Sequence, residues 1–131
     1  MASLFTKIIN GELPAYKVAE TDTFLAFLDI QPNTKGHTLC IPKKEVDRIW
    51  DLDENTFSEL MAFSRKVAFA IEKTIDCNRV GMAVVGLEVP HVHVHLIPLH
   101  TLKDMDFKQV TSLSEEEFQA TAKAIASNFE G

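Results

Sequence analysis

Three histidines alternate with aliphatic residues in one short run, and this run constrains the fold more than any other part of the sequence. The segment reads HVHVHLIP from residue 91 to residue 98. Side chains on a β-strand point alternately to opposite faces, so a strand here would place three imidazoles on one face and the aliphatic side chains on the other. Buried imidazoles need hydrogen-bond partners, which makes a purely structural role costly. The run predicts a strand over His91–Ile97 with an apolar face and a histidine face.

The rest of the sequence predicts helices and strands in the order of an α+β domain. Ser3–Ile9 is a short helix with Ser3 as N-cap, and Asp53–Ile75 is a long helix whose apolar residues recur every three or four positions. A final helix begins at Ser114, where Glu117 completes a capping box. The other predicted strands are Tyr16–Ala19, Phe24–Asp29, Thr38–Ile41 and Arg79–Val85. We predict a mainly antiparallel sheet covered on one side by helices, with a long helix and short terminal helices.

Length and charge limit the classes of function. A chain of 131 residues suits a single domain. Its net charge of −6 does not attract the negatively charged phosphates of nucleic acid polymers, so we expect no such partner. We expect no membrane partner, because no stretch approaches the 18 apolar residues of a membrane span. The two cysteines, Cys40 and Cys77, are too few for a disulfide scaffold, and we expect a cytoplasmic protein.

Three explanations of the histidine face compete. It could be a solvated strand face that is rich in histidine. It could be a metal site, because His-x-His can bind one ion with both rings, although no Asp lies within the motif and neither cysteine is near it in sequence. The third explanation is catalysis by a neutral imidazole, which can attack phosphorus to give a covalent intermediate.

The run HVHVHLIP resembles the signature of the histidine-triad superfamily of nucleotide hydrolases and transferases. The opening segment SLFTKIINGELPAYKVAETDTFLAFLDIQPNTKGHTLCIPKKEV is similar to the N-terminal half of that family. The resemblance covers roughly residues 3 to 98. It implies one histidine-triad domain over residues 1–131, with a core at 3–98 and a C-terminal tail and helix at 102–131.

The resemblance implies a role for each of four histidines. His93 matches the family's nucleophile, whose Nε2 attacks the α-phosphorus of a nucleotide, and the backbone carbonyl of His91 fixes its tautomer. His95 faces the leaving group and the phosphate oxygens, where it assists proton transfer. His37, in the segment GHTLCIP, matches a fourth histidine that hydrogen-bonds with the first triad member.

The resemblance also implies where a nucleotide lies. Asp29 matches the residue that accepts hydrogen bonds from the ribose hydroxyls, although the residue alone could equally be a turn former. Around the phosphate, the loop from Gly86 to Val89 is shorter than in relatives, with Glu88 near the position of a phosphate donor. Either Glu88 points to solvent while backbone N–H groups hold the phosphate, or the leaving group is cationic. The apolar positions that match the base site are Phe5, Ile8, Phe27 and Ile30.

The chain departs from its relatives at a structural zinc site. Many bacterial relatives hold zinc with a Cys-x-x-Cys, a histidine and the first triad histidine, whereas this chain has Ser3, Thr6 and Glu45 at the first three positions. We therefore predict no metal and no other cofactor. The resemblance implies a homodimer joined through the long helix and a sheet edge.

The sequence thus favours a nucleoside phosphoramidase-like hydrolase, independent of metal, that cleaves at the α-phosphate through a nucleotidyl-histidine and takes a purine nucleotide or its phosphoramidate. Two alternatives stay open. One is a dinucleoside polyphosphate hydrolase or nucleotidyl transferase, and the other is a nucleotide-binding scaffold that turns over slowly.

Overall fold

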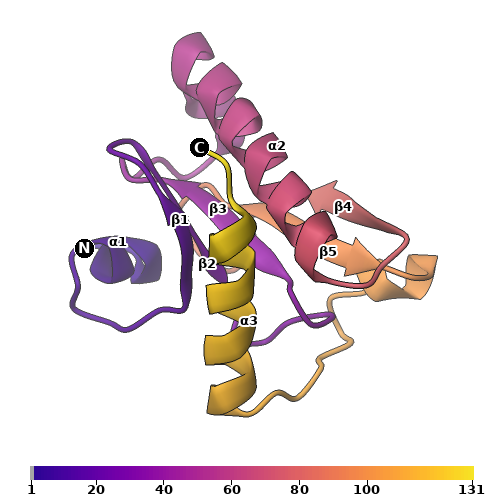
Figure 1. Ribbon diagram of the computed structural model, residues 1–131. Coiled ribbons are helices and arrows are strands. Elements are labelled where there is room, and N and C mark those ends of the chain that lie inside the picture. Colours follow the sequence, from indigo (N-terminus) through magenta and orange to yellow (C-terminus); the bar gives the residue numbers. More distant parts are fainter. Residues whose placement is uncertain (1) are drawn as a thin grey trace.

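A five-stranded antiparallel sheet forms the centre of the protein in the computed structural model, which describes residues 2–131 (Figure 1). The strand order is β1-β2-β3-β5-β4, and every neighbouring pair is antiparallel. The predicted antiparallel sheet is confirmed. The strand order makes β1 and β4 the two edge strands. The strands are β1 (Lys17–Glu20), β2 (Phe24–Leu28), β3 (Thr38–Pro42), β4 (Arg79–Ala83) and β5 (Val94–Leu99).

Three α-helices begin where the sequence places their N-caps. Ser3, Asp53 and Ser114 each accept a hydrogen bond from a backbone N–H in the first turn, which satisfies a donor that the helix itself cannot pair. The capping box of Ser114 and Glu117 is present. The helices are α1 (Leu4–Ile9), α2 (Glu54–Thr74) and α3 (Glu115–Asn128), with short 3₁₀ turns η1 (Ile49–Asp51) and η2 (Leu102–Met105).

Apolar side chains lie on both faces of the sheet. α2 and α3 cover one face of the sheet (Figure 1). On this face Val92, Val94 and Leu96 pack into the larger core. On the opposite face, Phe5 and Ile8 of α1 pack against β2 and β3 in a second, smaller cluster. Helices thus cover one side of the sheet as predicted, and α1 in addition caps part of the other side.

The strand that carries the histidines begins later than predicted. β5 starts at Val94, so His91 and His93 precede the regular ladder. Near this point β3 ends at Pro42, whose carbonyl accepts a hydrogen bond from the His91 ring. The alternation of faces nevertheless continues through residues 91 to 96, with the aliphatic side chains in the larger core. The ends of the other predicted strands lie within two residues of the observed ones.

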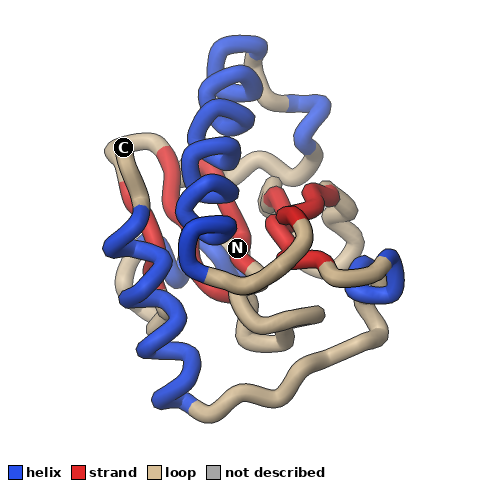
Figure 2. Tube along the Cα trace, turned by 45° about the vertical axis from the view of Figure 1, so that its right-hand side comes forward, coloured by secondary structure: helices blue, strands red, loops and turns tan. Residues whose placement is uncertain are grey.

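Two connecting segments are irregular. One is the turn between β2 and β3, where Gly36 has φ +97° and a side chain would collide with Ile75. The other is the long loop that connects η2 to α3, drawn in tan along the lower edge of Figure 2. Among the helices of residues 2–131, none has the length and apolar character to cross a membrane.

Candidate active site

The three triad histidines are almost completely buried, with exposed fractions of 0% for His91, 6% for His93 and 8% for His95. A solvated face rich in histidine is therefore the wrong explanation of the alternating run. Phe5 of α1 packs edge-on against the rings of His91 and His93, with centroids 5.9 and 5.0 Å away. Each buried ring needs polar partners, and these partners determine which nitrogen carries the proton.

His93 has its proton on Nδ1. This nitrogen lies 2.7 Å from the carbonyl oxygen of His91, and a carbonyl only accepts, so Nδ1–H is the donor. In the neutral imidazole the second nitrogen, Nε2, then keeps its lone pair. The side chain lines two adjoining cavities. A nucleophilic nitrogen held in this way is what attack on phosphorus requires.

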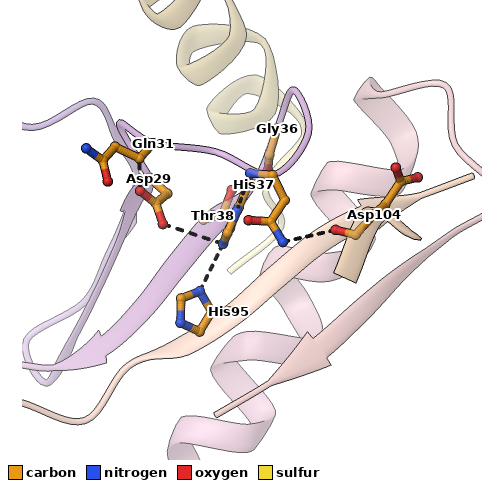
Figure 3. A network of polar contacts seen from close by, with 8 residues as sticks. Asp29, Gln31, Gly36, His37, Thr38, His95 and Asp104 are labelled. Atoms are coloured by element: carbon orange, nitrogen blue, oxygen red, sulfur yellow. Dashed lines mark hydrogen bonds and ion pairs between the residues drawn. The ribbon is translucent and has the colours of Figure 1, made fainter. Parts of the chain in front are cut away.

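His37 and His95 form a chain of hydrogen bonds whose direction is set by the backbone (Figure 3). The backbone N–H of Asn33 donates to His37 Nδ1 at 3.0 Å, so the neutral His37 ring carries its proton on Nε2. That Nε2–H donates to His95 Nδ1 at 2.9 Å, which leaves His95 with a proton on Nε2. Burial, with weaker repulsion from neighbouring histidines, lowers the pKa of His37 to about 3 and that of His95 to about 4.

The partner of His37 differs from the one expected. The resemblance implied a hydrogen bond to the first triad histidine, His91, whereas His37 bonds to the third, His95. The register explains the difference, because Leu39 pairs with His95 and thereby places residue 37 diagonally across from His95 on the same face. His91 lies further along, beside Pro42.

His91 is held by a polar network at the position of the relatives' zinc site. Its Nε2–H donates to Pro42 O at 2.8 Å, and its Nδ1 accepts from Ser3 Oγ at 2.8 Å. Glu45 Oε1 accepts from the Ser3 backbone N–H at 2.7 Å and from Thr6 Oγ1 at 2.6 Å. These hydrogen bonds, that of Thr6 first, lower the pKa of Glu45 to about 2. Burial lowers the pKa of His91, so its ring is neutral, and it links Ser3 at the start of α1 to the histidine run.

A cavity of about 480 Å³ opens beside the histidines and collects most of the predicted nucleotide-binding residues. Its size suits a small-molecule ligand. Gly86 is the exception, because it lines a neighbouring cavity of about 700 Å³ that also reaches His93. Ile30, although 70% exposed, belongs to the first cavity. The predicted residues that line it are Phe5, Ile8, Phe27, Asp29, Ile30, Glu88, Val89, His93 and His95.

Two acidic residues, Asp29 and Glu88, belong to the lining of this cavity. Burial raises the pKa of Asp29, and the negative charge of Glu88 adds to the effect. The backbone N–H of Gln31 donates to Asp29 Oδ1 at 2.9 Å, and Asp29 Oδ2 lies 3.6 Å from His37 Nε2. Glu88 is among the residues that line the cavity and is also exposed to solvent. Among the described residues that line the cavity, none is Lys or Arg.

Sequence reasoning missed two residues of the site. Asn33 orients His37 through its backbone, and Phe107 lies over His95 with the ring centroids 4.7 Å apart. In the sequence Asn33 has only the signature of a turn residue, and Phe107 stands in a segment without periodicity. Neither position gave a signal, since both act through contacts with distant parts of the chain.

Asp29, His37 and His95 bring donor atoms within 4.8 Å of one another, as a metal site would require. The hydrogen bonds argue against coordination. The one lone pair of the neutral His37 ring already accepts from Asn33, and that of His95 accepts from His37. A metal ion would have to break both bonds, so this group fits a metal poorly.

The alternating buried histidines, the antiparallel sheet and the adjoining cavity define a histidine-triad protein. A model of the HIT domain matches residues 10–102. An uncharacterised HIT-like protein of Borreliella burgdorferi is 35% identical over 134 residues, covering 95% of this chain and 96% of that protein. The adenosine 5′-monophosphoramidase hnt1 of Schizosaccharomyces pombe is 36% identical over 99 residues, covering 75% of this chain and 74% of that protein.

Solved structures agree with the sequence comparison. The crystal structure of a HIT-like protein involved in cell-cycle regulation, from Bartonella henselae, superposes with a TM-score of 0.84 at 30% identity. The match covers 96% of this chain and 95% of that one. The chain belongs to the HIT family.

Proposed function

We propose that this protein is a nucleoside phosphoramidase that cleaves the bond between the α-phosphorus and an amine nitrogen through a covalent intermediate on His93. The observation that carries the proposal is the tautomer of His93, whose Nδ1–H is fixed on the His91 carbonyl at 2.7 Å so that Nε2 keeps its lone pair. The function of the related S. pombe protein, an adenosine 5′-monophosphoramidase, supports the same reaction class.

In the first step, the Nε2 lone pair of His93 attacks the α-phosphorus and forms a P–N bond. The bond from phosphorus to the leaving nitrogen breaks, and its electron pair departs with the amine, which takes one proton from solvent. His95 Nε2–H donates a hydrogen bond to that developing lone pair, a preorganised donor that costs no reorganisation. The imidazolium that forms on His93 keeps its Nδ1–H on the His91 carbonyl.

In the second step, water attacks the phosphorus and the bond to His93 breaks. The electron pair returns to Nε2, and the water releases the proton that the first step consumed. The products are the nucleoside monophosphate and the free enzyme. The low pKa of His37 and of His95 keeps both rings neutral, so neither adds a positive charge beside the imidazolium of His93.

The charge of the cavity favours a phosphoramidate over a dinucleoside polyphosphate. Asp29 and Glu88 both line it, and among its described residues no Lys or Arg offsets them. A polyphosphate would bring several negative charges to this site, whereas a phosphoramidate brings one and releases an amine. Asp29 is our candidate for the ribose hydroxyls, and the apolar residues of α1 and β2 are our candidates for the base.

We also propose that the reaction needs no metal. The positions of the relatives' zinc ligands carry Ser3, Thr6 and Glu45, which bond to one another and to His91. These oxygen donors are poorer zinc ligands than the cysteines and histidine they stand for.

Steady-state hydrolysis tests the proposal. We expect the metal-free protein in excess EDTA to release ammonia and AMP from adenosine 5′-phosphoramidate, and to act far more slowly on diadenosine tetraphosphate. His93→Ala should lose at least about 10³-fold in kcat, because the covalent route is closed. A wild-type protein that binds AMP but hydrolyses neither compound would favour the slow scaffold. Preference for diadenosine tetraphosphate would favour the polyphosphate hydrolase.

We further propose a homodimer formed through the β4 edge. Trp50, Met82, Val85 and Leu87 are exposed apolar side chains that lie together beside the open edge of β4, with Trp50 75% and Leu87 88% exposed. Such a patch beside an open edge is typical of a protein interface. Light scattering should give twice the chain mass for the wild type and one chain mass for Trp50→Glu; a wild-type monomer at micromolar concentration would refute the dimer.

A cytoplasmic location is the last part of the proposal. Both cysteines are free thiols, Cys40 buried and Cys77 partly buried, as is usual in a reducing compartment. Fractionation of cells that express the protein tests this, and its recovery outside the cytoplasm would contradict it.

A further inference from the structure

A segment near the C-terminus holds the turn that orients His37. Asn33 is 1% exposed, and its polar groups bind residues 71 to 78 positions later in the chain. Its side-chain Nδ2–H donates to Asp104 O at 3.0 Å (Figure 3 labels Asp104 at one end of this contact). Its carbonyl oxygen accepts from Gln109 Nε2 at 3.0 Å and from Thr111 Oγ1 at 2.8 Å.

The same segment fixes the neighbouring residue and covers the rings. The Thr111 N–H donates to the carbonyl of Pro32 at 2.7 Å. Phe107 packs edge-on over His95, with the centroids 4.7 Å apart, and lies 6.3 Å from the ring of His37. We name residues 104–111 the strap. The strap contacts the hydrogen-bonded pair of His37 and His95 in two ways: through the Asn33 turn, and directly through Phe107.

The direction of the Asn33 N–H determines which ring nitrogen carries the proton in His37 and in His95. If this N–H left His37 Nδ1, the ring could carry its proton on Nδ1 and turn an acceptor toward His95. His95 would then have to donate from Nδ1, and its Nε2 would present a lone pair to the leaving group instead of a proton. One misplaced backbone donor would thus reverse both rings and remove the donor that assists departure.

We infer that Asn33 and Thr111 are positioning residues for catalysis: the strap clamps Asn33 so that its backbone N–H imposes on His37 and His95 the tautomers that leave His95 Nε2–H facing the leaving group. This inference rests on the proposed function for its effect on rate. Its effect on the tautomers is independent of any activity.

Nitrogen NMR of the imidazoles tests the tautomers directly. Long-range ¹H–¹⁵N correlation spectra distinguish protonated from bare ring nitrogens. In the wild type we expect bare Nδ1 and protonated Nε2 on both His37 and His95. In Asn33→Ala and Thr111→Val we expect the second tautomer to appear on both rings together. Nδ1–H on His37 in the wild type, or variant spectra identical to those of the wild type, would overturn the inference.

A comparison of leaving groups tests the catalytic consequence. Ammonia is a poor leaving group that needs the His95 donor, whereas p-nitrophenolate departs with little help. We expect Asn33→Ala and Thr111→Val to lower kcat for adenosine 5′-phosphoramidate about tenfold, a part of the 10²–10³ that one such donor supplies. For the p-nitrophenyl ester of AMP, we expect a loss of less than about twofold.

The control is Thr34→Val, which removes a hydrogen bond of similar length from the same turn, that of Thr34 Oγ1 to Pro98 O at 2.7 Å. It should leave the ratio of the two rates unchanged. Equal losses on both substrates in Asn33→Ala and Thr111→Val, or an altered ratio in the control, would refute the strap as a positioning device. A wild type that hydrolyses neither substrate would instead refute the proposed function, and the NMR result would still decide the tautomers.

Discussion

Ser3 performs two tasks at once, and removing its hydroxyl separates them. Ser3 Oγ accepts from the Thr6 N–H at 3.1 Å as the N-cap of α1, and it donates to the buried His91 Nδ1 at 2.8 Å. In Ser3→Ala the lost cap costs about 1 kcal/mol. The buried acceptor on His91 costs about 1–3 kcal/mol more, because it keeps only a long 3.4 Å contact to Thr6 Oγ1, whose hydrogen is donated to Glu45. We therefore expect the free energy of unfolding to fall by about 2–4 kcal/mol.

Ser114→Ala is the matched control. Ser114 caps α3 with the same geometry, accepting from the Glu117 N–H at 3.1 Å, but its contact is exposed and reaches no histidine. This variant should lose only about 1 kcal/mol. Urea unfolding followed by circular dichroism gives both values, provided that the m-values agree. If Ser3→Ala loses no more stability than Ser114→Ala, the bond to His91 does not stabilise the fold and our account of that site is refuted.

Two further predictions concern pH and metal. Since the pKa of His37 and of His95 is lowered in the folded state, to about 3 and about 4, the unfolded chain takes up protons first as the pH falls. The free energy of unfolding should be highest above pH 6.5 and should fall by about 2 kcal/mol per histidine between pH 6.5 and 5. Urea titrations should show a smaller fall over this range for His37→Gln than for the wild type. An equal fall in the two proteins would contradict this prediction. Elemental analysis should find no stoichiometric zinc in the purified wild type, but zinc in a triple variant with Ser3→Cys, Thr6→Cys and Glu45→His; zinc in the wild type would contradict the account of this site.

Much of the fold was predictable because its signals are local. The alternation around His93 places the histidines and the aliphatic residues on opposite faces even where the strand ladder is not regular. The structure confirms this, because Val92, Val94 and Leu96 lie in the larger core. The capping residues Ser3, Asp53 and Ser114 determine helix starts within one turn, and all three act as N-caps. The start of β5 was predicted three residues too early, because the alternation of faces continues through His91 and His93 ahead of the regular ladder, where the His91 ring donates to the Pro42 carbonyl.

The candidate site was predictable in its residue types but not in its connections. The partner of His37 depends on the register between β3 and β5, two strands separated by α2 and β4 in the chain. The strap depends on hydrogen bonds between Asn33 and residues 104–111, a pairing with no local signature. Contacts between residues so far apart in the chain produce no periodic pattern in the sequence. They are therefore visible only in the three-dimensional structure.

The chemistry proposed for His93 is tested most directly by isolating the intermediate. The protein is mixed with adenosine 5′-phosphoramidate and quenched in alkali within milliseconds, because a phosphorus–histidine bond survives alkali and breaks in acid. Intact mass spectrometry should then find one adenylyl group per chain, and peptide mapping should locate it on His93. An adduct on another residue, or active enzyme that never carries an adduct at any quench time, would contradict the account.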